Sequence, residues 1–317
     1  MKIAMIGSGA AGSVFASYLR LGGADMYLVD LNKAHMDKVA ADGMIFRTPD
    51  GEFHPTGFHT AYSAAEIGVM DVIIVMVKST QTDAVMPGVM PAIGPDTVVV
   101  SLQNGLGNDD TLKKYVPANR IVCGNGVMGT ELPEPGVCVA KPEKGICMQF
   151  GMVEPSEVSY KACMYMKDTF TAGGCPAAYY DDIRPYIWKK AISNGGFNPV
   201  STILRLKMGI VGTDDNGAWL VWQIWKEGCE VAKAAGVRDL WPEMVEEMPK
   251  LVAHLGNYYP SMAQDALMFK RQTEISTLNA KIAEYGAKYG VPTPVNETIS
   301  KIMLAIQAHY DEQYQEK

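Results

Sequence analysis

The chain begins with MKIAMIGSGAAG, residues 1–12. The first six residues form a short apolar run typical of a buried parallel strand, and a glycine-rich stretch follows at once. Apolar residues then recur at helical spacing, at Val14, Phe15, Tyr18 and Leu19. A strand, a glycine turn and a helix in this order predict the phosphate-binding turn of a dinucleotide-binding unit. The alternative is a tight turn that binds no ligand.

The glycine-rich turn supplies the first set of predicted cofactor-binding residues: Gly7, Ser8, Gly9, Ala10, Ala11 and Gly12. Gly7 would allow the sharp turn, Gly9 the approach of the pyrophosphate to the backbone, and Gly12 the close packing of helix on strand. The N-terminus of the helix would offer its N–H groups and its positive dipole end to the phosphates.

The second strand indicates which dinucleotide would bind. The apolar residues 26–29 end in Asp30, about twenty residues beyond the glycines, where an acid binds the ribose 2′-hydroxyl. A carboxylate there also repels a 2′-phosphate, so Asp30 favours NAD(H), and NADP(H) is the second choice. Two alternatives stay open: Asp30 caps the helix that begins near Lys33, or Asn32 and Lys33 accommodate a phosphate.

Size and composition are those of a globular protein with two domains. The chain has 317 residues, of which 48% are hydrophobic and 20% charged, and its net charge is −7. The negative charge argues against nucleic acid as a partner, and no apolar run is long enough to cross a membrane. The six scattered cysteines lack metal-binding spacing, so we expect no metal and a reducing, cytoplasmic location.

Strand and helix patterns alternate in the first half of the chain. Strands are expected near 71–77, 97–102 and 120–124, and helices near 33–41, 80–93 and 108–116. This alternation predicts an α/β fold with a doubly wound, Rossmann-type parallel sheet. Residues 127–151, with short β-prone runs, are expected to form a strand extension.

From Asp181 onward the pattern is helical throughout. Amphipathic segments occur near 183–198, 215–236, 241–255, 261–289 and 295–312. We therefore expect a dinucleotide-binding domain over 1–181 and an all-α substrate and catalytic domain over 182–317. Trp219, Trp222 and Trp225 would pack in the core or against a second subunit, as in a homodimer formed through the helical domain.

Polar residues follow two of the expected parallel strands, at the edge where ligands gather in such sheets. Lys78 and Gln81 follow the strand near 71–77, and Asn104 follows the strand near 97–102. Asn104 would present its amide beside the nicotinamide. Alternatively, the Asn104-Gly105 pair is simply a turn.

The first helix of the second domain carries a catalytic pattern. Lys190, Asn194 and Asn198 are spaced four residues apart, so they line one helix face. The glycines at 195–196 weaken a helix by roughly 1 kcal/mol each, which suits a close approach of backbone or ligand, and Pro199 would end or kink it. A lysine with two amides can protonate an oxygen and orient a polar substrate. The alternative is a solvated lysine beside two structural asparagines.

Together these segments resemble the ketopantoate reductase (2-dehydropantoate 2-reductase) family. The resemblance covers nearly the whole chain and includes SMAQD at 261–265 and RQTEI at 271–275, which are similar to the family's S-M-x-Q-D and R-x-T-E-I-D motifs. It implies a Rossmann domain followed by a helical domain, with the active site in the cleft. The reaction it implies is hydride transfer from NAD(P)H to a 2-oxo acid.

The resemblance also implies roles for single residues. Lys190 would be the general acid that protonates the carbonyl oxygen, with Glu274 near it, and Lys78 and Asn104 would lie beside the cofactor. The substrate's carboxylate and hydroxyl groups would be held by Asn194, Asn198, Asn257 and Ser261. A lysine ammonium suits this chemistry because hydride delivery builds negative charge on oxygen.

Several features depart from the family pattern or have a second explanation. Asp30 is an acid at a position where NADPH-using relatives lack one, and Leu31 takes the place of their basic residue. Ser276 replaces the aspartate of the family's R-x-T-E-I-D motif. The loop 257–260 is bulky. Ser261 followed by Gln264 three residues later is also a capping box, so its hydroxyl would cap the next helix.

The predicted reaction gives an (R)-2-hydroxy acid, with ketopantoate to pantoate in pantothenate biosynthesis as the leading assignment. NADH use and the bulky loop leave other branched or aromatic 2-oxo acids as an alternative. A 3-hydroxyacid or sugar-phosphate dehydrogenase would need a basic phosphate pocket, for which Lys270 and Arg271 are the candidates. A non-catalytic NAD(H)-binding regulator should lack Lys190 and Glu274.

Overall fold

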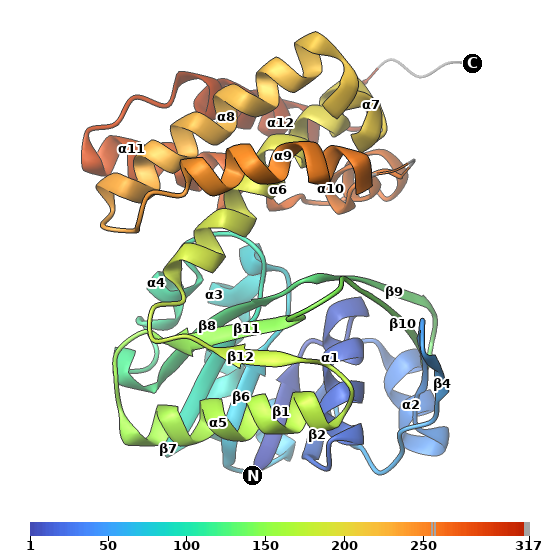
Figure 1. The fold of residues 1–317 in the computed structure, drawn as a ribbon. Coiled ribbons are helices and arrows are strands. Elements are labelled where there is room, and N and C mark those ends of the chain that lie inside the picture. The colour runs from blue at the N-terminus through green and yellow to red at the C-terminus, as the bar shows by residue number, and fades with distance from the viewer. Residues whose placement is uncertain (255, 257, 314–317) are drawn as a thin grey trace. The chain divides into compact units, whose positions relative to one another are not determined.

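The computed structural model describes residues 1–254, 256 and 258–313, and the chain divides into two compact units. Unit 1 contains Met1–Gln103 and Asn108–Ile183, and unit 2 contains Asn104–Gly107 and Arg184–Lys317. Figure 1 shows the sheet of unit 1 and the helices of unit 2. The short loop Asn104–Gly107 therefore belongs with the helices, although the chain on either side of it lies in unit 1.

Unit 1 is built on an eight-stranded sheet of order β12-β11-β8-β7-β6-β1-β2-β5. Its strands are β1 (Lys2–Ile6), β2 (Asp25–Val29), β5 (His59–Ala61), β6 (Met70–Val75), β7 (Ile93–Ser101), β8 (Ile121–Gly126), β11 (Met148–Met152) and β12 (Ala177–Tyr179). The strands from β5 to β8 are parallel, and β11 is antiparallel to β8. This order confirms the Rossmann-type doubly wound sheet, whose switch point lies between β1 and β6.

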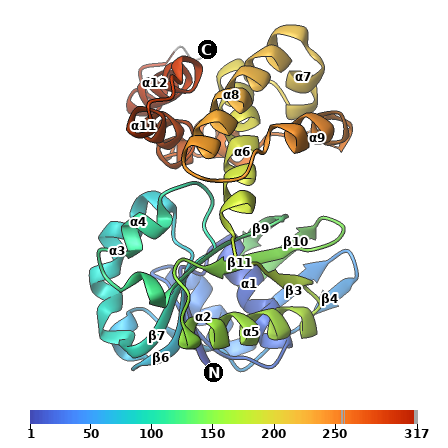
Figure 2. The ribbon, with the colours of Figure 1, turned by 60° about the vertical axis from the view of Figure 1, so that its left-hand side comes forward.

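Helices cover both faces of this sheet (Figure 2). One face carries α1 (Ala10–Leu21), α2 (Lys33–Asp42) and α5 (Glu157–Ala172), and the other α3 (Thr82–Val89) and α4 (Asn108–Leu112). Short 3-10 turns complete the connections: η1 (Ala64–Glu66), η2 (Ser79–Gln81), η3 (Met90–Ala92) and η4 (Ala118–Arg120). Because both faces are covered, successive residues of the central strands are buried, as the continuous apolar runs predict.

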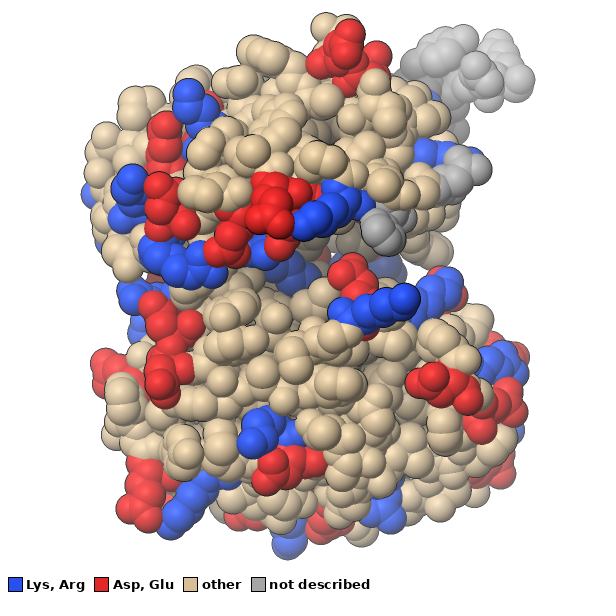
Figure 3. Space-filling view, in the orientation of Figure 1, with Lys and Arg blue, Asp and Glu red and all other residues tan. Residues whose placement is uncertain are grey.

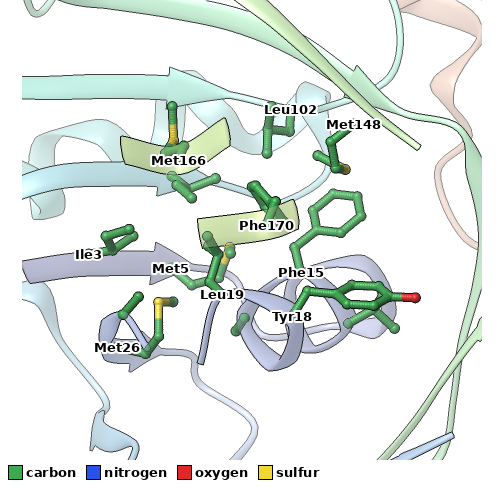
Figure 4. Packing of buried hydrophobic residues seen from close by; sticks show 14 of the residues in the cluster. Ile3, Met5, Phe15, Tyr18, Leu19, Met26, Leu102, Met148, Met166 and Phe170 are labelled. Atoms are coloured by element: carbon green, nitrogen blue, oxygen red, sulfur yellow. The ribbon is translucent and has the colours of Figure 1, made fainter. Parts of the chain in front are cut away.

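The core of unit 1 lies between the sheet and the helices α1 and α5. Phe15 of α1 and Phe170 of α5 point toward one another (Figure 4), with ring centroids 6.3 Å apart in an edge-to-face arrangement. Met5 of β1 and Leu19 of α1 pack in the same cluster and are fully buried. The apolar side chains that recur at helical spacing in α1 are thus buried in this core, as expected.

A second, four-stranded sheet in unit 1 has the order β4-β3-β10-β9. Its strands are β3 (Ile45–Thr48), β4 (Gly51–Phe53), β9 (Met128–Glu134) and β10 (Val137–Pro142). The β-prone stretch 127–151 therefore divides, because β9 and β10 join this small sheet whereas β11 extends the large one.

Unit 2 is helical. Its helices are α6 (Arg184–Leu204), α7 (Met208–Thr213), α8 (Asp215–Ala234), α9 (Trp241–His254), α10 (Ser261–Ala263), α11 (Asn279–Tyr289) and α12 (Pro294–Ala308), with a π-helical turn η5 (Gln264–Met268) and a 3-10 turn η6 (Glu274–Thr277). Helix α6 packs against α7, α8, α10 and α12. Trp225 lies in this core, whereas Trp219 is 57% exposed and its predicted subunit contact stays a prediction.

The stretch 261–289 is interrupted, whereas one helix was expected. The chain leaves the helical conformation after Met268, and Lys270 has a φ of 47°. The buried Asp265 carboxylate accepts a hydrogen bond from Arg271 Nε at 2.6 Å, which closes the turn. Residues six positions apart do not face each other on an α-helix, so this contact accompanies the break in the helix.

Cysteines and surface charges fit an ordinary globular chain. All six cysteines are buried and unpaired, and burial raises the pKa of Cys138 to about 11. Acidic and basic side chains are interspersed on the face shown in Figure 3. Among the described residues, no cluster of His, Cys, Asp or Glu is arranged to hold a metal ion, and no helix is both long and apolar enough to cross a bilayer.

Candidate active site

The three glycines of the turn after β1 occupy three different environments. Gly7 has a φ of +97°, and a Cβ there would lie 2.7 Å from the Val77 nitrogen. A Cβ on Gly12 would lie 2.0 Å from the Gly7 carbonyl oxygen, so the helix packs directly on the turn. At Gly9, by contrast, no described atom lies within 4 Å of such a Cβ. The turn therefore leaves open the position that a pyrophosphate would approach.

The N-terminus of α1 and the end of β2 complete this region. Within the described chain, the first turn of α1 holds no acidic residue and no side chain caps it. Asp30 accepts hydrogen bonds from the backbone N–H groups of Ser8, at 2.7 Å, and Asn32, at 2.8 Å. The cap of α2 is Asn32, whose side chain accepts from the His35 N–H. The alternative that Asp30 caps this helix is therefore wrong.

The buried His35 contacts two serines at the glycine turn and the start of α1. The His35 Nδ1 accepts a hydrogen bond from the Gly136 N–H at 3.0 Å, so the ring hydrogen is on Nε2. That nitrogen lies 3.2 Å from Ser8 Oγ and 3.1 Å from Ser13 Oγ. Burial lowers the pKa of His35, against the opposing charge of Asp30, which favours the neutral ring.

Gln103 joins the ends of β6 and β7. Its Nε2 donates to the Val77 carbonyl at 2.6 Å and to Thr82 Oγ1 at 2.9 Å. Two predicted cofactor-binding residues lie in the segment it holds: Lys78 precedes η2 and is half-buried, and Gln81 is exposed at the start of α3. Sequence reasoning did not single out Gln103 or His35, because neither residue's pattern reveals which distant groups it contacts.

Lys190, Asn194 and Asn198 lie on the single helix α6, as the spacing predicted. Lys190 and Asn194 are half-buried and Asn198 is 5% exposed. Pro199 does not end α6, which continues to Leu204. Among the described residues, no hydrogen bond joins the Asn194 or Asn198 side-chain amide to the protein, so both amides can serve a ligand.

The neighbouring lysine is committed to a different contact. Lys189 forms ion pairs with Glu243, at 3.5 Å, and Glu247, both on α9. These two adjacent lysines therefore have different environments, because Lys189 contacts acids of α9 while Lys190 lies on the same helix face as Asn194.

The glycines of α6 are explained by helix packing. A Cβ on Gly196 would lie 2.3 Å from Nε1 of Trp225 on α8, so the two helices approach closely here. A Cβ on Gly195 would make only ordinary contacts, the nearest at 3.5 Å from the Asn279 side chain. Of the two glycines, only Gly196 is therefore required by a close approach, and that approach is between helices α6 and α8.

Asn104 and Glu274 meet within unit 2. The Asn104 Nδ2 lies 3.5 Å from Glu274 Oε2, and the Leu106 N–H donates to the Thr277 carbonyl at 2.8 Å. Gly105 has a φ of +90°, and a Cβ there would lie 2.6 Å from Thr277 Oγ1. The Asn-Gly turn and the placement of the Asn104 amide are thus one feature, because the turn seats the loop on η6.

The predicted substrate-binding residue Ser261 is the first residue of α10. The N-cap of α10 is Pro260, and the described structure shows no side-chain cap there, so the capping box at Ser261 does not form. Gln264 Nε2 donates instead to the Tyr259 carbonyl at 3.1 Å. The Ser261 side chain is exposed. Asn257 lies outside the described residues.

Two family models match the chain along most of its length. The model described as "Ketopantoate reductase PanE/ApbA" matches residues 3–149, and "Ketopantoate reductase PanE/ApbA C terminal" matches 182–307. The chain belongs to the ketopantoate reductase family. It is accordingly an oxidoreductase by class.

Named relatives and solved structures agree with this family. A 2-dehydropantoate 2-reductase of Lactococcus lactis is 29% identical over 96% of this chain and 97% of its own length. The corresponding protein of Pyrococcus horikoshii is 30% identical over 93% and 94%. A D-mandelate dehydrogenase solved with NADH and anilino(oxo)acetate is 28% identical, with a TM-score of 0.86 over 97% and 98% of the two chains. The 2-dehydropantoate 2-reductase of Geobacter metallireducens is 25% identical, with a TM-score of 0.87 over 96% and 99%.

Proposed function

We propose that this ketopantoate reductase family member reduces the keto carbon of a small 2-oxo acid to an (R)-2-hydroxy acid with a nicotinamide dinucleotide. One observation carries the proposal: Lys190, Asn194 and Asn198 lie on one uninterrupted helix of a chain in this family. An ammonium group with two amides on one helix face suits a substrate that has a carbonyl oxygen and a carboxylate.

The residues of unit 1 fit a dinucleotide. The open space at Gly9 and the α1 N-terminus, which has no acidic residue in its first turn, suit a pyrophosphate. The Asp30 carboxylate suits a ribose hydroxyl. The bound nicotinamide would supply the hydride. Structures of D-mandelate dehydrogenase that contain NADH support a nicotinamide cofactor. Asp30 supports NAD(H) over NADP(H), because a carboxylate would repel a 2′-phosphate.

In the proposed reaction, the Lys190 ammonium donates a proton to the carbonyl oxygen as negative charge develops there. Asn194 and Asn198 would orient the substrate's carboxylate and hydroxyl groups, together with Ser261 and Asn257. Glu274 would hold its place beside Lys190 through the Asn104 contact.

The leading substrate is ketopantoate, which the names of the relatives support. Other branched or aromatic 2-oxo acids are the second candidate, and one observation favours them: the D-mandelate dehydrogenase complex holds an aromatic oxoacid derivative. In this chain Tyr258, next to the predicted substrate loop residues, is 52% exposed.

A phosphate-bearing substrate has less support. The two cations considered for a phosphate pocket each form an ion pair, Arg271 with the buried Asp265 at 2.6 Å and Lys270 with Asp311 at 3.1 Å. Freeing Arg271 for a phosphate would break its charge-assisted contact with the buried Asp265 carboxylate.

The proposal is tested by offering NADH and NADPH with ketopantoate, 2-oxoisovalerate and phenylglyoxylate, and by determining the configuration of each product. In Lys190→Ala, turnover should fall by roughly 10²- to 10⁴-fold, while NADH affinity stays nearly unchanged. The matched variant Lys189→Ala, which loses the α9 ion pairs, should retain turnover within a few fold. Comparable losses in both variants, or oxidation of neither cofactor by any of these acids, would overturn the proposal.

A further inference from the structure

The backbone of α6 lacks one of its own hydrogen bonds beside the predicted catalytic face. In an α-helix the carbonyl of residue 195 accepts from the N–H of residue 199. Residue 199 is Pro199, which has no N–H, and a proline ring also presses against the carbonyl four residues earlier. Gly195 is buried, so its carbonyl needs another donor inside the protein.

Asn279 supplies that donor. Its Nδ2 donates to the Gly195 carbonyl oxygen at 2.9 Å, from the first residue of α11. The Asn279 residue is fully buried. The second hydrogen of the same Nδ2 goes to Oδ1 of Asn296 at 3.1 Å. Both donors of this amide are therefore used within the protein, which distinguishes Asn279 from an amide that binds substrate.

Residues of two other helices, Asn296 of α12 and Glu227 of α8, set the orientation of the Asn279 amide. The Asn296 Nδ2 donates to Glu227 Oε2 at 2.8 Å and to the Ile224 carbonyl at 3.2 Å. Its Oδ1 must then face Asn279. The Glu227 carboxylate also accepts the backbone N–H groups of Val295 and Asn296, each at 2.9 Å, so it is itself held at the start of α12.

The Asn279 amide has one unmatched atom. Within the described residues, its buried Oδ1 has no hydrogen-bond partner. Turning the amide over would place this acceptor against two other acceptors, the Gly195 carbonyl and Asn296 Oδ1. The observed orientation thus favours the donor to Gly195 even though the oxygen is left without a partner.

We propose that Asn279 is a positioning residue, which replaces the backbone donor missing from Pro199 and so holds the α6 turn that carries Asn194 and Asn198 in register with Lys190. Its own orientation is set by Asn296 and Glu227. The effect of Asn279 on catalysis rests on the proposed function. The structural part of the proposal, in which Asn279 replaces the donor missing at Pro199, is independent of that function.

The test is a double-mutant cycle in the full-length protein. Asn279→Ala should lower kcat/KM for the preferred 2-oxo acid by roughly 10- to 100-fold, as a small misplacement of catalytic groups does, and leave the NADH dissociation constant unchanged. Pro199→Ala restores a backbone N–H at residue 199. In that background the same Asn279→Ala change should lower kcat/KM by no more than a few fold, because the donor is redundant. Equal losses in both backgrounds would overturn the proposal.

The exposed Asn216 on α8 provides a matched control, since Asn216→Ala should behave as wild type in both backgrounds. If Asn279→Ala fails to fold, the outcome is read from the Pro199→Ala/Asn279→Ala double variant. A folded double variant supports the proposal, and an unfolded one contradicts it.

A second readout separates this proposal from the proposed function. Hydrogen exchange of the amides at 196–204, measured without substrate, should speed up in Asn279→Ala and return toward wild type in the double variant. If wild type reduces no 2-oxo acid but this exchange pattern holds, the proposed function fails and the coupling stands. If exchange is unaffected, Asn279 does not hold this turn.

Discussion

The backbone N–H of Ser8 donates to the Asp30 carboxylate at 2.7 Å, which joins the glycine turn to the end of β2. Replacing Asp30 with alanine would remove both this contact and the negative charge. Asp30→Asn keeps an acceptor for Ser8 and removes only the charge. We expect Asp30→Asn to lower the ratio of kcat/KM with NADH to kcat/KM with NADPH by about tenfold, equivalent to ~1.4 kcal/mol. Equal changes with the two cofactors would contradict a role of Asp30 in cofactor choice.

The glycine turn offers a matched pair of alanine substitutions. A Cβ at Gly12 would meet the Gly7 carbonyl oxygen at 2.0 Å, so Gly12→Ala should lower the free energy of unfolding by about 3 kcal/mol, the upper end for overpacking. Gly9→Ala should change it by less than about 1 kcal/mol, yet weaken NADH binding at least about tenfold, because the methyl group occupies the approach of the pyrophosphate. Urea unfolding and fluorescence titration measure the two effects. Unchanged NADH affinity in Gly9→Ala would argue against a dinucleotide at this turn.

His35 makes the stability of the protein depend on pH. Burial lowers its pKa in the folded state below the ordinary value of about 6.5. The unfolded chain therefore binds this proton first as the pH falls, and the free energy of unfolding should decrease from about pH 6.5 down to the folded-state pKa. Above pH 6.5 the contribution is fully present. His35→Gln should reduce the slope of unfolding free energy against pH in this window, and the same slope in both proteins would show that His35 is not its source.

The glycines of α6 form a second matched pair. Gly196→Ala brings a methyl group to 2.3 Å from Trp225 Nε1 and should destabilise the protein by about 1–3 kcal/mol. Gly195→Ala makes ordinary contacts and should be neutral or stabilise by up to ~1 kcal/mol through helix propensity. Thermal unfolding of the two variants distinguishes them. The reverse order would mean that the α6–α8 packing differs from that described.

Much of the fold could be predicted from local pattern. The apolar run of β1, the glycines after it and the periodic residues of α1 form a contiguous unit, so their contacts are short-range. The Lys190–Asn198 face likewise follows from helical spacing on one element. In both places a single period, read along adjacent residues, carries the information.

What local pattern did not predict depends on groups that are distant in sequence. Gly136, which sets the ring hydrogen of His35, lies 101 residues away, and Asn279 is 84 residues from Gly195. The interruption of 261–289 is accompanied by the Asp265–Arg271 ion pair, a contact that helical periodicity over the same residues does not reveal. The Ser261 capping box failed because Pro260 takes the cap position.

The loop Asn104–Gly107 has a consequence for dissecting the protein. Leu106 packs in the helical core and is only 3% exposed, although the chain enters this loop from β7 and returns to α4. If the gene were divided between codons 183 and 184, Leu106 would stay on the N-terminal fragment with its side chain exposed. The helical fragment would have a cavity where Leu106 packs. We expect the two fragments to be poorly soluble apart, and co-expression to recover them better than separate production.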